Sequence, residues 1–407
     1  MKRQQPQFLR ISTLLAFVLI PLGGFATDIY IPSLPAMSQH LGVSVQAVQL
    51  SLLLFMVSSG GSQLFIGSLL DSYGRYRFNL VALGLFALAS FTIAVTGNLY
   101  VIYAMRVLQG VTVSLIIVGK RAFFVDMYQG RQLKHYTSLF SIVWATAPIL
   151  APFIGGYLQH AWGWQASFYF LGIVTALVLL FELIYSGESL DTWPPFDGQH
   201  IRRVYRHMLG TADFVLGLLI TGLSYALLVI YGMVSPFIIE KIYGYTPVTT
   251  GYSSLLSGVA LMSGGIVSKL LLNQPLRAKL NGAMLLQGIT AVLMWVTTRQ
   301  VDRLEVLLGF TFVLHFIAGF LFNNLYAYCL QRFTTHAGTA SGLTGGGIYV
   351  VSSAVSYGLI HLIDLTNTQA LAVVNLGLVA MLLLTIVVFQ RMARQRIGVV
   401  AAEVVTR

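Results

Sequence analysis

The residues best suited to chemistry in this chain are two ionisable side chains within long apolar stretches, Asp28 and Arg106. A charged side chain at the centre of a bilayer costs about 3 kcal/mol or more, so such a residue is a functional candidate by default. Desolvation favours the neutral form of a carboxyl group, whereas a neighbouring Arg favours the carboxylate. We therefore predict that Asp28 binds and releases a proton and that Arg106 tunes this equilibrium.

Simpler interpretations of these residues remain open at the level of sequence. Two prolines follow Asp28 and remove helix hydrogen bonds, so the helix should kink there, and Asp28 can lie hydrated near the outer surface. Arg106 can extend to the interface; otherwise it needs an acid, a carbonyl group or water as its partner. Gln109 shares a helix face with Arg106, and we predict that Gln109 and Tyr30 contribute to a substrate cavity.

The elements that must hold these residues are membrane-spanning helices. Of the 407 residues, 57% are hydrophobic and 9% are charged, whereas soluble domains carry about 25% charged residues. Twelve apolar segments are long enough to cross about 30 Å of hydrocarbon, which predicts an all-α polytopic membrane protein. The predicted limits are 12–35, 46–70, 78–97, 99–122, 136–158, 164–186, 211–238, 248–272, 279–298, 303–331, 338–362 and 369–391.

The net charge of +11 reports orientation and not a nucleic-acid partner. Most of the 24 Lys and Arg residues lie between predicted spans on one side, which places both termini in the cytoplasm. The basic N-terminus leads into an apolar run without a small-residue cleavage site, so we expect a retained first span. The single cysteine, Cys329, excludes an intrachain disulfide and a cysteine metal cluster. We expect a monomeric, multi-pass protein of the bacterial inner (plasma) membrane with no bound metal.

The longest connection follows the sixth segment and divides the chain six and six. We predict an N-terminal six-helix bundle at 1–186, a central cytoplasmic loop at 187–210, and a C-terminal six-helix bundle with a short basic tail at 211–407. The basic second half of the loop predicts a short surface helix against anionic lipid headgroups. A plain linker is the alternative.

A weak internal repeat supports this division. A shift of 202 residues places Arg75-Tyr76-Arg77 on Arg277-Ala278-Lys279. The same shift places Asp28 on Ile230 and Asp71 on Asn273, so the two halves share a frame while the first half keeps the acids.

A second group of candidate residues lies in the connection GSLLDSYGRYR between the second and third segments. Its charges cannot lie in hydrocarbon, and a glycine permits a sharp turn at the membrane surface. A solvated hairpin is the simpler interpretation. The spacing Gly67-x3-Asp71-x2-Gly74-Arg75-x-Arg77 resembles the signature loop of the major facilitator superfamily.

The fifth segment carries paired prolines and glycines, namely Pro148, Pro152, Gly155 and Gly156. Prolines four residues apart lie on one helix face, and the glycines permit close approach of another helix. This composition suits a helix that bends or rocks against a neighbour, although packing alone can also explain it.

Four stretches together resemble the proton-driven multidrug exporters with twelve helices, in their bicyclomycin- and chloramphenicol-resistance branch. They are DIYIPSLP at the end of the first span, RVLQG of the fourth, the RAFFVDMY that follows it, and APxxxPxxGG in the fifth. The resemblance implies the major facilitator fold, with two pseudo-symmetric six-helix bundles around a central cavity, alternating access and proton antiport. By position, it makes Asp28 the membrane acid, Arg106 the Arg of the fourth helix, and Asp71, Arg75 and Asp126 a cytoplasmic gate.

The chain departs from the pattern of that branch in two places, and the charges near the gate have another interpretation. Ala147 stands where the fifth-helix motif usually has Gly, and Tyr76 stands where the signature loop usually has a basic residue. From the residues alone, Asp126 can serve a purely structural ion pair with Arg75 or Arg131.

Polar residues of the second half can build the other wall of a cavity. His315 and Asn323 are eight residues apart, close to one helix face, and His315 can titrate near neutrality or bind a polar ligand. A lone His in a span is more often a hydrogen-bond partner between helices. The candidates are Tyr225, Tyr231, His315, Asn323, Asn324 and Tyr349.

We therefore predict a secondary transporter that exports amphipathic small molecules, such as drugs or a siderophore-like metabolite, by proton antiport. Its partners are this substrate and the lipid bilayer, and protons are the coupling ion without any cofactor. The alternative is a proton-coupled importer (symporter) of a small metabolite. A membrane enzyme or an ATP-driven pump lacks support, because the sequence shows no metal-ligand set within a span, no nucleophile motif and no phosphate-binding loop.

Overall fold

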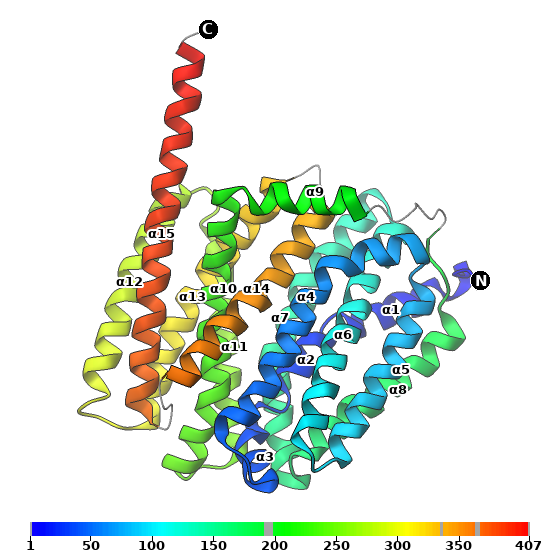
Figure 1. Cartoon of the computed structure of the whole chain (residues 1–407), viewed down its shortest axis with the longest axis horizontal. Helices are drawn as coiled ribbons and strands as arrows, with labels where there is room; N and C mark the ends of the chain where they lie inside the picture. The colour runs from blue at the N-terminus through cyan, green and yellow to red at the C-terminus, as the bar shows by residue number, and fades with distance from the viewer. Residues whose placement is uncertain (1, 191–197, 334–336, 363–366, 406–407) are drawn as a thin grey trace. The chain divides into compact units, whose positions relative to one another are not determined.

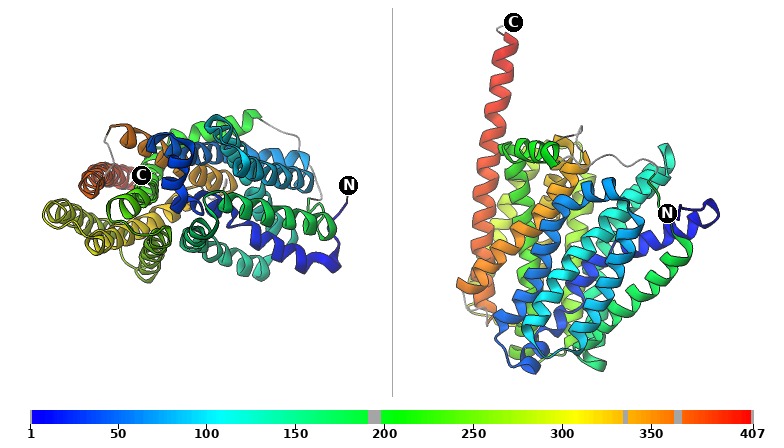
Figure 2. Two further views of the ribbon diagram at one scale, coloured as in Figure 1. Left: turned by 90° about the horizontal axis from the view of Figure 1, so that it is seen from below. Right: turned by 45° about the vertical axis from the view of Figure 1, so that its right-hand side comes forward.

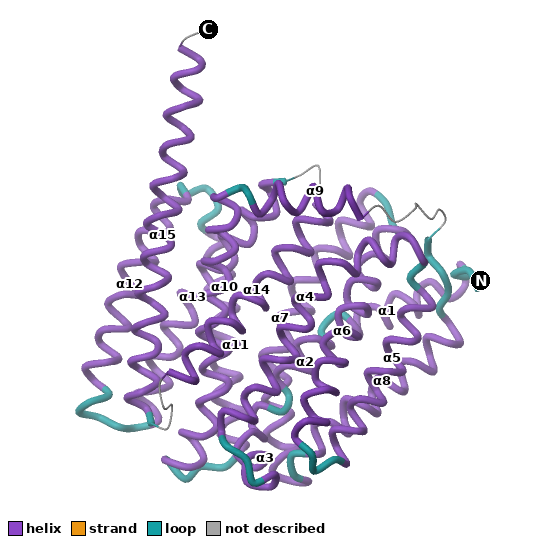
Figure 3. Tube along the Cα trace, viewed as in Figure 1, coloured by secondary structure: helices purple, strands orange, loops and turns teal. Residues whose placement is uncertain are grey.

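The structure is a computed structural model that describes residues 2–190, 198–333, 337–362 and 367–405. These residues are helical and contain no β-strand (Figure 1 and Figure 3). One isolated bridge pairs Arg3 with Glu188. The prediction of an all-α chain is confirmed.

The first predicted span is interrupted twice. Pro21 follows α1, and α2 ends at Asp28, directly before the segment that contains Pro32 and Pro35. The kink expected after Asp28 is therefore present, whereas the break before α2 was not predicted. The pieces are η1 (Pro6–Phe8), α1 (Leu9–Leu19), α2 (Leu22–Asp28), η2 (Ile31–Ser33) and α3 (Leu34–Leu41).

The remaining predicted spans of the first half are continuous helices whose ends lie within a few residues of the predicted limits. They are α4 (Val45–Tyr73), α5 (Tyr76–Val95), α6 (Leu99–Met127), α7 (Gly130–Trp162) and α8 (Gln165–Tyr185).

The second half begins with the predicted surface helix, α9. It is rich in exposed Arg and His residues and runs crosswise to α10 and α14 in Figure 1. The elements are α9 (Gly198–Leu209), α10 (Ala212–Phe237), η3 (Ile238–Ile242), α11 (Pro247–Leu270), α12 (Leu276–Thr297), α13 (Leu304–Arg332), α14 (Ala337–Leu362) and α15 (Thr368–Val405).

By length and composition, eleven helical stretches in the described part of the chain can cross a membrane. That count does not include α7, and several side chains of this helix lie outside the described set. With 33 residues, α7 is nevertheless within the length range of the stretches that were counted. Each of the twelve predicted segments thus corresponds to a helical stretch.

The chain packs into two compact units. The first contains Met1–Phe196 and Gly232–Gly258, and the second contains Asp197–Tyr231 and Val259–Arg407. Residues 232–258, which we predicted to be part of the C-terminal bundle, therefore pack with the first unit, and α10 and α11 each contribute to both units. The division into two six-helix bundles at 1–186 and 211–407 stays a prediction.

In the first unit, α4 packs on α6, and α5 packs on α6 and α8. Gly110 lets α6 approach α4 closely, because a Cβ atom there would lie 2.5 Å from the backbone oxygen of Phe55 and 2.9 Å from the nitrogen of Ser59. This close approach brings Arg106, one turn earlier on α6, against α4.

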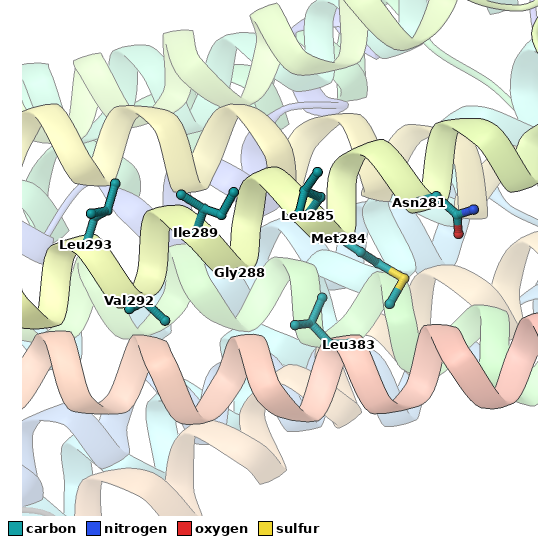
Figure 4. A pocket seen from close by; sticks show the side chains of 8 residues that line it. All are labelled: Asn281, Met284, Leu285, Gly288, Ile289, Val292, Leu293 and Leu383. Atoms are coloured by element: carbon teal, nitrogen blue, oxygen red, sulfur yellow. The ribbon is translucent and has the colours of Figure 1, made fainter.

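In the second unit, α12 packs against α13 and α15, and α14 contacts α13 and α9. The pair α12 and α15 lies side by side in Figure 1 and Figure 2. A groove of about 640 Å³ lies along this pair, and Figure 4 shows Met284 of α12 and Leu383 of α15 within it.

Candidate functional site

Arg106 lies at the centre of a buried cluster in the first unit and is 0% exposed. Its Nη1 atom donates hydrogen bonds to the backbone oxygen of Ala26 at 3.0 Å and to Oε1 of Gln109 at 2.9 Å. Its Nε atom donates to the backbone oxygen of Ser51 at 3.4 Å. Arg106 is therefore not an interfacial residue, and its hydrogen bonds are to two carbonyl oxygens and one amide.

Two aromatic rings enclose the guanidinium group of Arg106. Its central carbon lies 4.7 Å from the ring centroid of Tyr30 and 4.2 Å from that of Phe55. Such contacts favour a desolvated cation by about 2 kcal/mol or more. The hydroxyl group of Tyr30 bonds Oγ of Ser51 at 3.1 Å, so the ring position is also fixed.

Gln109 extends this hydrogen-bond network, since its Nε2 atom donates to Oγ of Ser90 at 2.8 Å. Gln109 and Tyr30 are both 0% exposed, so in this structure they support Arg106 and do not face open space. We call this group the Arg106 cluster; it consists of Ala26, Tyr30, Ser51, Phe55, Ser90, Arg106 and Gln109.

Asp28 lies beside the Arg106 cluster at the last residue of α2. It is 9% exposed, which disfavours the interpretation of a hydrated surface residue. Its charge and that of Arg106 lie close enough to interact, yet among the described residues Asp28 forms no hydrogen bond and no ion pair within 4.0 Å. The Nη2 atom of Arg106 is also buried without a partner within 3.5 Å in the described part of the chain. The acid and the cation thus lie close enough to interact without bonding each other.

A second site joins the signature loop to α6. Arg75 forms ion pairs with Asp126 and, at 2.9 Å, with Asp71. Ser189 donates a hydrogen bond to the same Asp126 oxygen at 2.7 Å. The structural pairing of Asp126 with Arg75 is therefore present. The side chain of Asp71 is 51% exposed, so solvent screens its ion pair with Arg75.

Glu188 is a member of this network that the sequence did not single out. One of its carboxylate oxygens accepts hydrogen bonds from the backbone nitrogens of Arg75 at 2.9 Å and Tyr76 at 3.0 Å. A carboxylate at this position satisfies free N–H groups and complements the dipole of α5. Its backbone also pairs with Lys2 and Gln4, which fixes the N-terminal segment to the end of α8.

The other signature-loop residues have simpler roles. Gly74 adopts φ 90° at the end of α4, a conformation that favours glycine. Arg77 is exposed. A Cβ atom added to Gly67 would meet no atom within 4 Å, so packing does not explain this glycine. Tyr76, at the position where a basic residue was expected, donates to the backbone oxygen of Glu182 at 3.4 Å.

The glycines of α7 permit direct backbone contact, as predicted. A Cβ atom on Gly155 would lie 2.7 Å from the carbonyl carbon of Ile29 and closer still to its oxygen. A Cβ atom on Gly156 would lie 2.7 Å from the backbone oxygen of Pro247 in α11. Gly155 thus contacts the residue that follows Asp28, and Gly156 contacts the start of α11.

The prolines of α7 lie along the same contact with α11. A Cβ atom added to Gly258 of α11 would lie 3.0 Å from the backbone oxygen of Pro148. A Cβ atom added to Gly251 of α11 would lie 2.9 Å from the backbone oxygen of Pro152. Ala147, which replaces the usual glycine, packs its methyl group against Gly24 of α2. The methyl group of Ala147, where the motif usually has glycine, is therefore accommodated by a glycine on the neighbouring helix.

A buried ion pair in the first unit was not among the predicted site residues. Lys120 on α6 bonds Glu182 on α8 at 2.6 Å, with side chains 8% and 0% exposed. Asn79 on α5 donates to the same carboxylate at 3.2 Å. The presence of an ionisable residue in each of two predicted spans could have indicated an ion pair. Their spacing in the sequence, however, gave no reason to pair these two residues.

The second-half candidates lie on several surfaces. The ring of His315 is 5.3 Å from that of Tyr231, and His315 hydrogen-bonds the backbone of Leu227, so it links α13 to α10. Asn323 instead donates to the backbone oxygen of Gly265 at 3.2 Å and to Oγ of Ser268 at 3.2 Å, both on α11. The two side chains therefore contact different helices, and their contribution to one cavity wall stays a prediction.

The remaining second-half candidates are partly or fully buried. Tyr225 packs against Tyr349, with ring centroids 5.9 Å apart. Asn324 donates to the backbone oxygen of Phe320, one turn earlier in its own helix. Two pairs of candidates are thus brought together, Tyr225 with Tyr349 and His315 with Tyr231.

Comparison with known proteins tests these interpretations at the level of family. The Major Facilitator Superfamily profile matches residues 16–357. The chain belongs to the Major Facilitator Superfamily. This confirms the resemblance of the signature loop and makes the protein a membrane transporter and not an enzyme.

Relatives of this family member are found in several bacteria. An uncharacterized MFS-type transporter, YdgK of Bacillus subtilis, is 30% identical over 86% of this chain and 88% of its own length. Multidrug resistance protein D of Escherichia coli is 29% identical over 85% and 86%, and a bicyclomycin resistance protein homolog of Haemophilus influenzae is 27% identical over 87% and 89%. The resemblance to the drug-exporter branch is confirmed by these names.

A solved structure supports the predicted fold. The D-xylose-proton symporter superposes with a TM-score of 0.65 over 91% of this chain and 96% of its own, at 13% identity. At that identity the likeness shows the fold alone, and the predicted major facilitator fold is confirmed.

Proposed function

We propose that this transporter exports amphipathic small molecules from the bacterial cytoplasm across the inner membrane by proton antiport. The observation that carries the proposal is the juxtaposition of Asp28 with the Arg106 cluster. A carboxyl group that is 9% exposed and unbonded, next to a fully buried Arg, is expensive to keep in a membrane protein unless it functions. Relatives named for multidrug and bicyclomycin resistance support the class of substrate.

Competition at Asp28 would couple the proton to the substrate. Arg106 keeps its positive charge at all working pH values. The site is neutral in charge when Asp28 is ionised and carries one positive charge when Asp28 is protonated. A cationic or strongly polar substrate therefore favours the ionised form and expels the proton, and a proton that enters from the acidic side expels the substrate.

Alternating access would act through the two contact regions of the first unit. On one side, backbone contacts at Gly155 and Gly156 hold α7 against the end of α2 and the start of α11. On the other side, Arg75, Asp71 and Asp126 form the proposed cytoplasmic gate. Because Gly155 contacts the residue after Asp28, movement of α7 would directly alter the surroundings of the acid.

Proton release from purified protein tests the coupling. Ethidium or chloramphenicol is added to weakly buffered, detergent-purified protein, and the pH is recorded with an indicator dye. The unmodified chain should release protons, and Asp28→Asn should bind the compound without release and without pH dependence. Glu305→Gln, at an exposed acid of α13, is the matched control and should behave like the unmodified chain. Release that persists in Asp28→Asn would refute the assignment.

The direction of transport requires vesicles. In everted membrane vesicles with an acidic interior, an antiporter accumulates ethidium inside, whereas a symporter expels it. Arg106→Ala should abolish accumulation. Arg106→Lys should retain a fraction of it, since Lys keeps the charge but cannot reproduce the stacking between Tyr30 and Phe55.

A further inference from the structure

The turn between α11 and α12 has an uncompensated positive charge. Lys269, Arg277 and Lys279 lie in or beside this turn, and residues 242–301 contain no Asp or Glu. Neither Arg277 nor Lys279 forms an ion pair within 4.0 Å among the described residues. A counter-charge for this turn must therefore come from outside these two helices.

The corresponding turn of the first half, between α4 and α5, does have acidic partners, so their absence is specific to the turn between α11 and α12. Arg277 corresponds to Arg75, which in the first unit is paired with two acids and has its helix start capped by a third. The repeat places neutral residues at all three positions: Asn273 for Asp71, Tyr328 for Asp126 and Gln390 for Glu188. Tyr328 and Gln390 are engaged elsewhere, with Asp213 and Asn281.

A cavity of about 330 Å³ begins at this basic turn and continues into the apolar part of the bundle. Gln274 and Lys279 line its polar end, and Phe316, Ile317 and Phe320 of α13 line its apolar wall. From Lys279 to the lining residue Leu286, α12 rises by about 10 Å, which is most of the depth of one hydrocarbon leaflet. Leu271 and Leu286 are 39% and 47% exposed, so the groove opens toward the membrane.

We propose that this cavity binds an anionic phospholipid. The phosphate group lies against Lys279 with Gln274 as a further donor, and one acyl chain occupies the groove between α11, α12 and α13. Basic pockets between transmembrane helices are suited to anionic headgroups, and each Lys or Arg near the surface contributes about 1 kcal/mol. The charge that Asp71, Asp126 and Glu188 supply in the first half is supplied here by the lipid.

The neighbouring groove between α12 and α15 lacks this feature and serves as an internal comparison. It is larger, about 640 Å³, and Figure 4 shows that apolar side chains and Asn281 line it. It can accept acyl chains, but no charged side chain lines it, so it should not distinguish anionic from zwitterionic lipids.

Native mass spectrometry of the delipidated full-length protein tests the proposal, with phosphatidylglycerol and phosphatidylcholine as the two probes. Phosphatidylglycerol should bind more tightly, and Lys279→Gln should weaken its binding about fivefold, which corresponds to about 1 kcal/mol. Arg299→Gln is the matched control: this exposed residue follows the opposite end of α12 and does not line the cavity, so phosphatidylglycerol affinity should change less than about twofold.

A second variant tests the acyl-chain part of the site. A Cβ atom on Gly282, which lines the cavity, would meet no atom within 4 Å, so Gly282→Leu can fold and fill the groove. It should lower the affinity for phosphatidylglycerol at least as much as Lys279→Gln does. Equal binding of the two lipids, unchanged binding in Lys279→Gln or Gly282→Leu, or displacement of the lipid by inorganic phosphate alone would overturn the proposal.

Discussion

Substitution of Gly155 by Ala should separate α7 from the end of α2. The added Cβ atom would lie 2.7 Å from the carbonyl carbon of Ile29 and nearer to its oxygen, and real Cβ atoms essentially never lie within 3.0 Å of another heavy atom. Both clashing atoms belong to the backbone, so no side-chain rotation can relieve the contact. Overpacking of this kind costs about 1–3 kcal/mol, and we expect the upper half of that range here.

Gly61→Ala supplies the reference for this measurement. Gly61 lies in α4, and a Cβ atom there would meet nothing within 4 Å, so this variant should gain the roughly 1 kcal/mol by which Ala exceeds Gly in a helix. Gly155→Ala should gain the same stabilisation from helix propensity, but the clash with Ile29 should destabilise it by more than this gain. The difference between the two variants therefore isolates the cost of the contact.

The assay is the reactivity of a cysteine introduced at Ser33, which is 0% exposed and lies just beyond Ile29. If Gly155→Ala opens the contact of α7 with α2, the labelling rate of Ser33→Cys should rise about 30- to 150-fold, the equivalent of about 2–3 kcal/mol. Transport of ethidium should fall in parallel, since the closed arrangement next to Asp28 is disfavoured. An unchanged labelling rate together with normal transport, as expected of Gly61→Ala, would refute the assignment of Gly155 as a closing contact.

Three further predictions concern charged and polar residues. Asp71→Asn should slow transport with substrate affinity nearly unchanged, and it should increase cysteine labelling at the cytoplasmic mouth; unchanged labelling at the cytoplasmic and outer mouths would contradict a gate. Glu182→Gln should lower the free energy of unfolding by about 3–5 kcal/mol in detergent, because it leaves Lys120 buried and unpaired, whereas Lys120→Met combined with Glu182→Leu should restore most of the loss. His315→Gln should change which compounds are transported and leave the pH dependence of transport intact; a lost pH response would assign the proton to the second half.

Local features of the fold were readable from the sequence because they depend on local physics. Twelve apolar stretches predicted the helical stretches of the chain, since a helix is the way to satisfy backbone groups in lipid, although the first is interrupted near Pro21 and α15 extends to Val405. The end of α2 near Pro32, the turn at Gly74 and the surface helix α9 were predicted for similar reasons. Each depends on a conformational restriction or on charge within a few residues of the chain.

The pairing of helix faces was less predictable, as His315 and Asn323 show. A span that is apolar on all sides carries little information about which face meets which neighbour. His315 and Asn323 lie eight residues apart on α13, yet His315 contacts α10 and Asn323 contacts α11. The packing of residues 232–258 with the first unit depends on glycine contacts that are similarly invisible without the partner helix.

The sequence by itself indicated the family and marked Asp28 and Arg106 as candidate functional residues, because charge within hydrocarbon is costly wherever it occurs. Only the tertiary structure decided which groups surround them. The cluster around Arg106 draws on α2, α4, α5 and α6, and the cap on α5 comes from Glu188, more than a hundred residues away. Such partners are fixed by the packing of several helices at once, and no spacing along the chain encodes that packing.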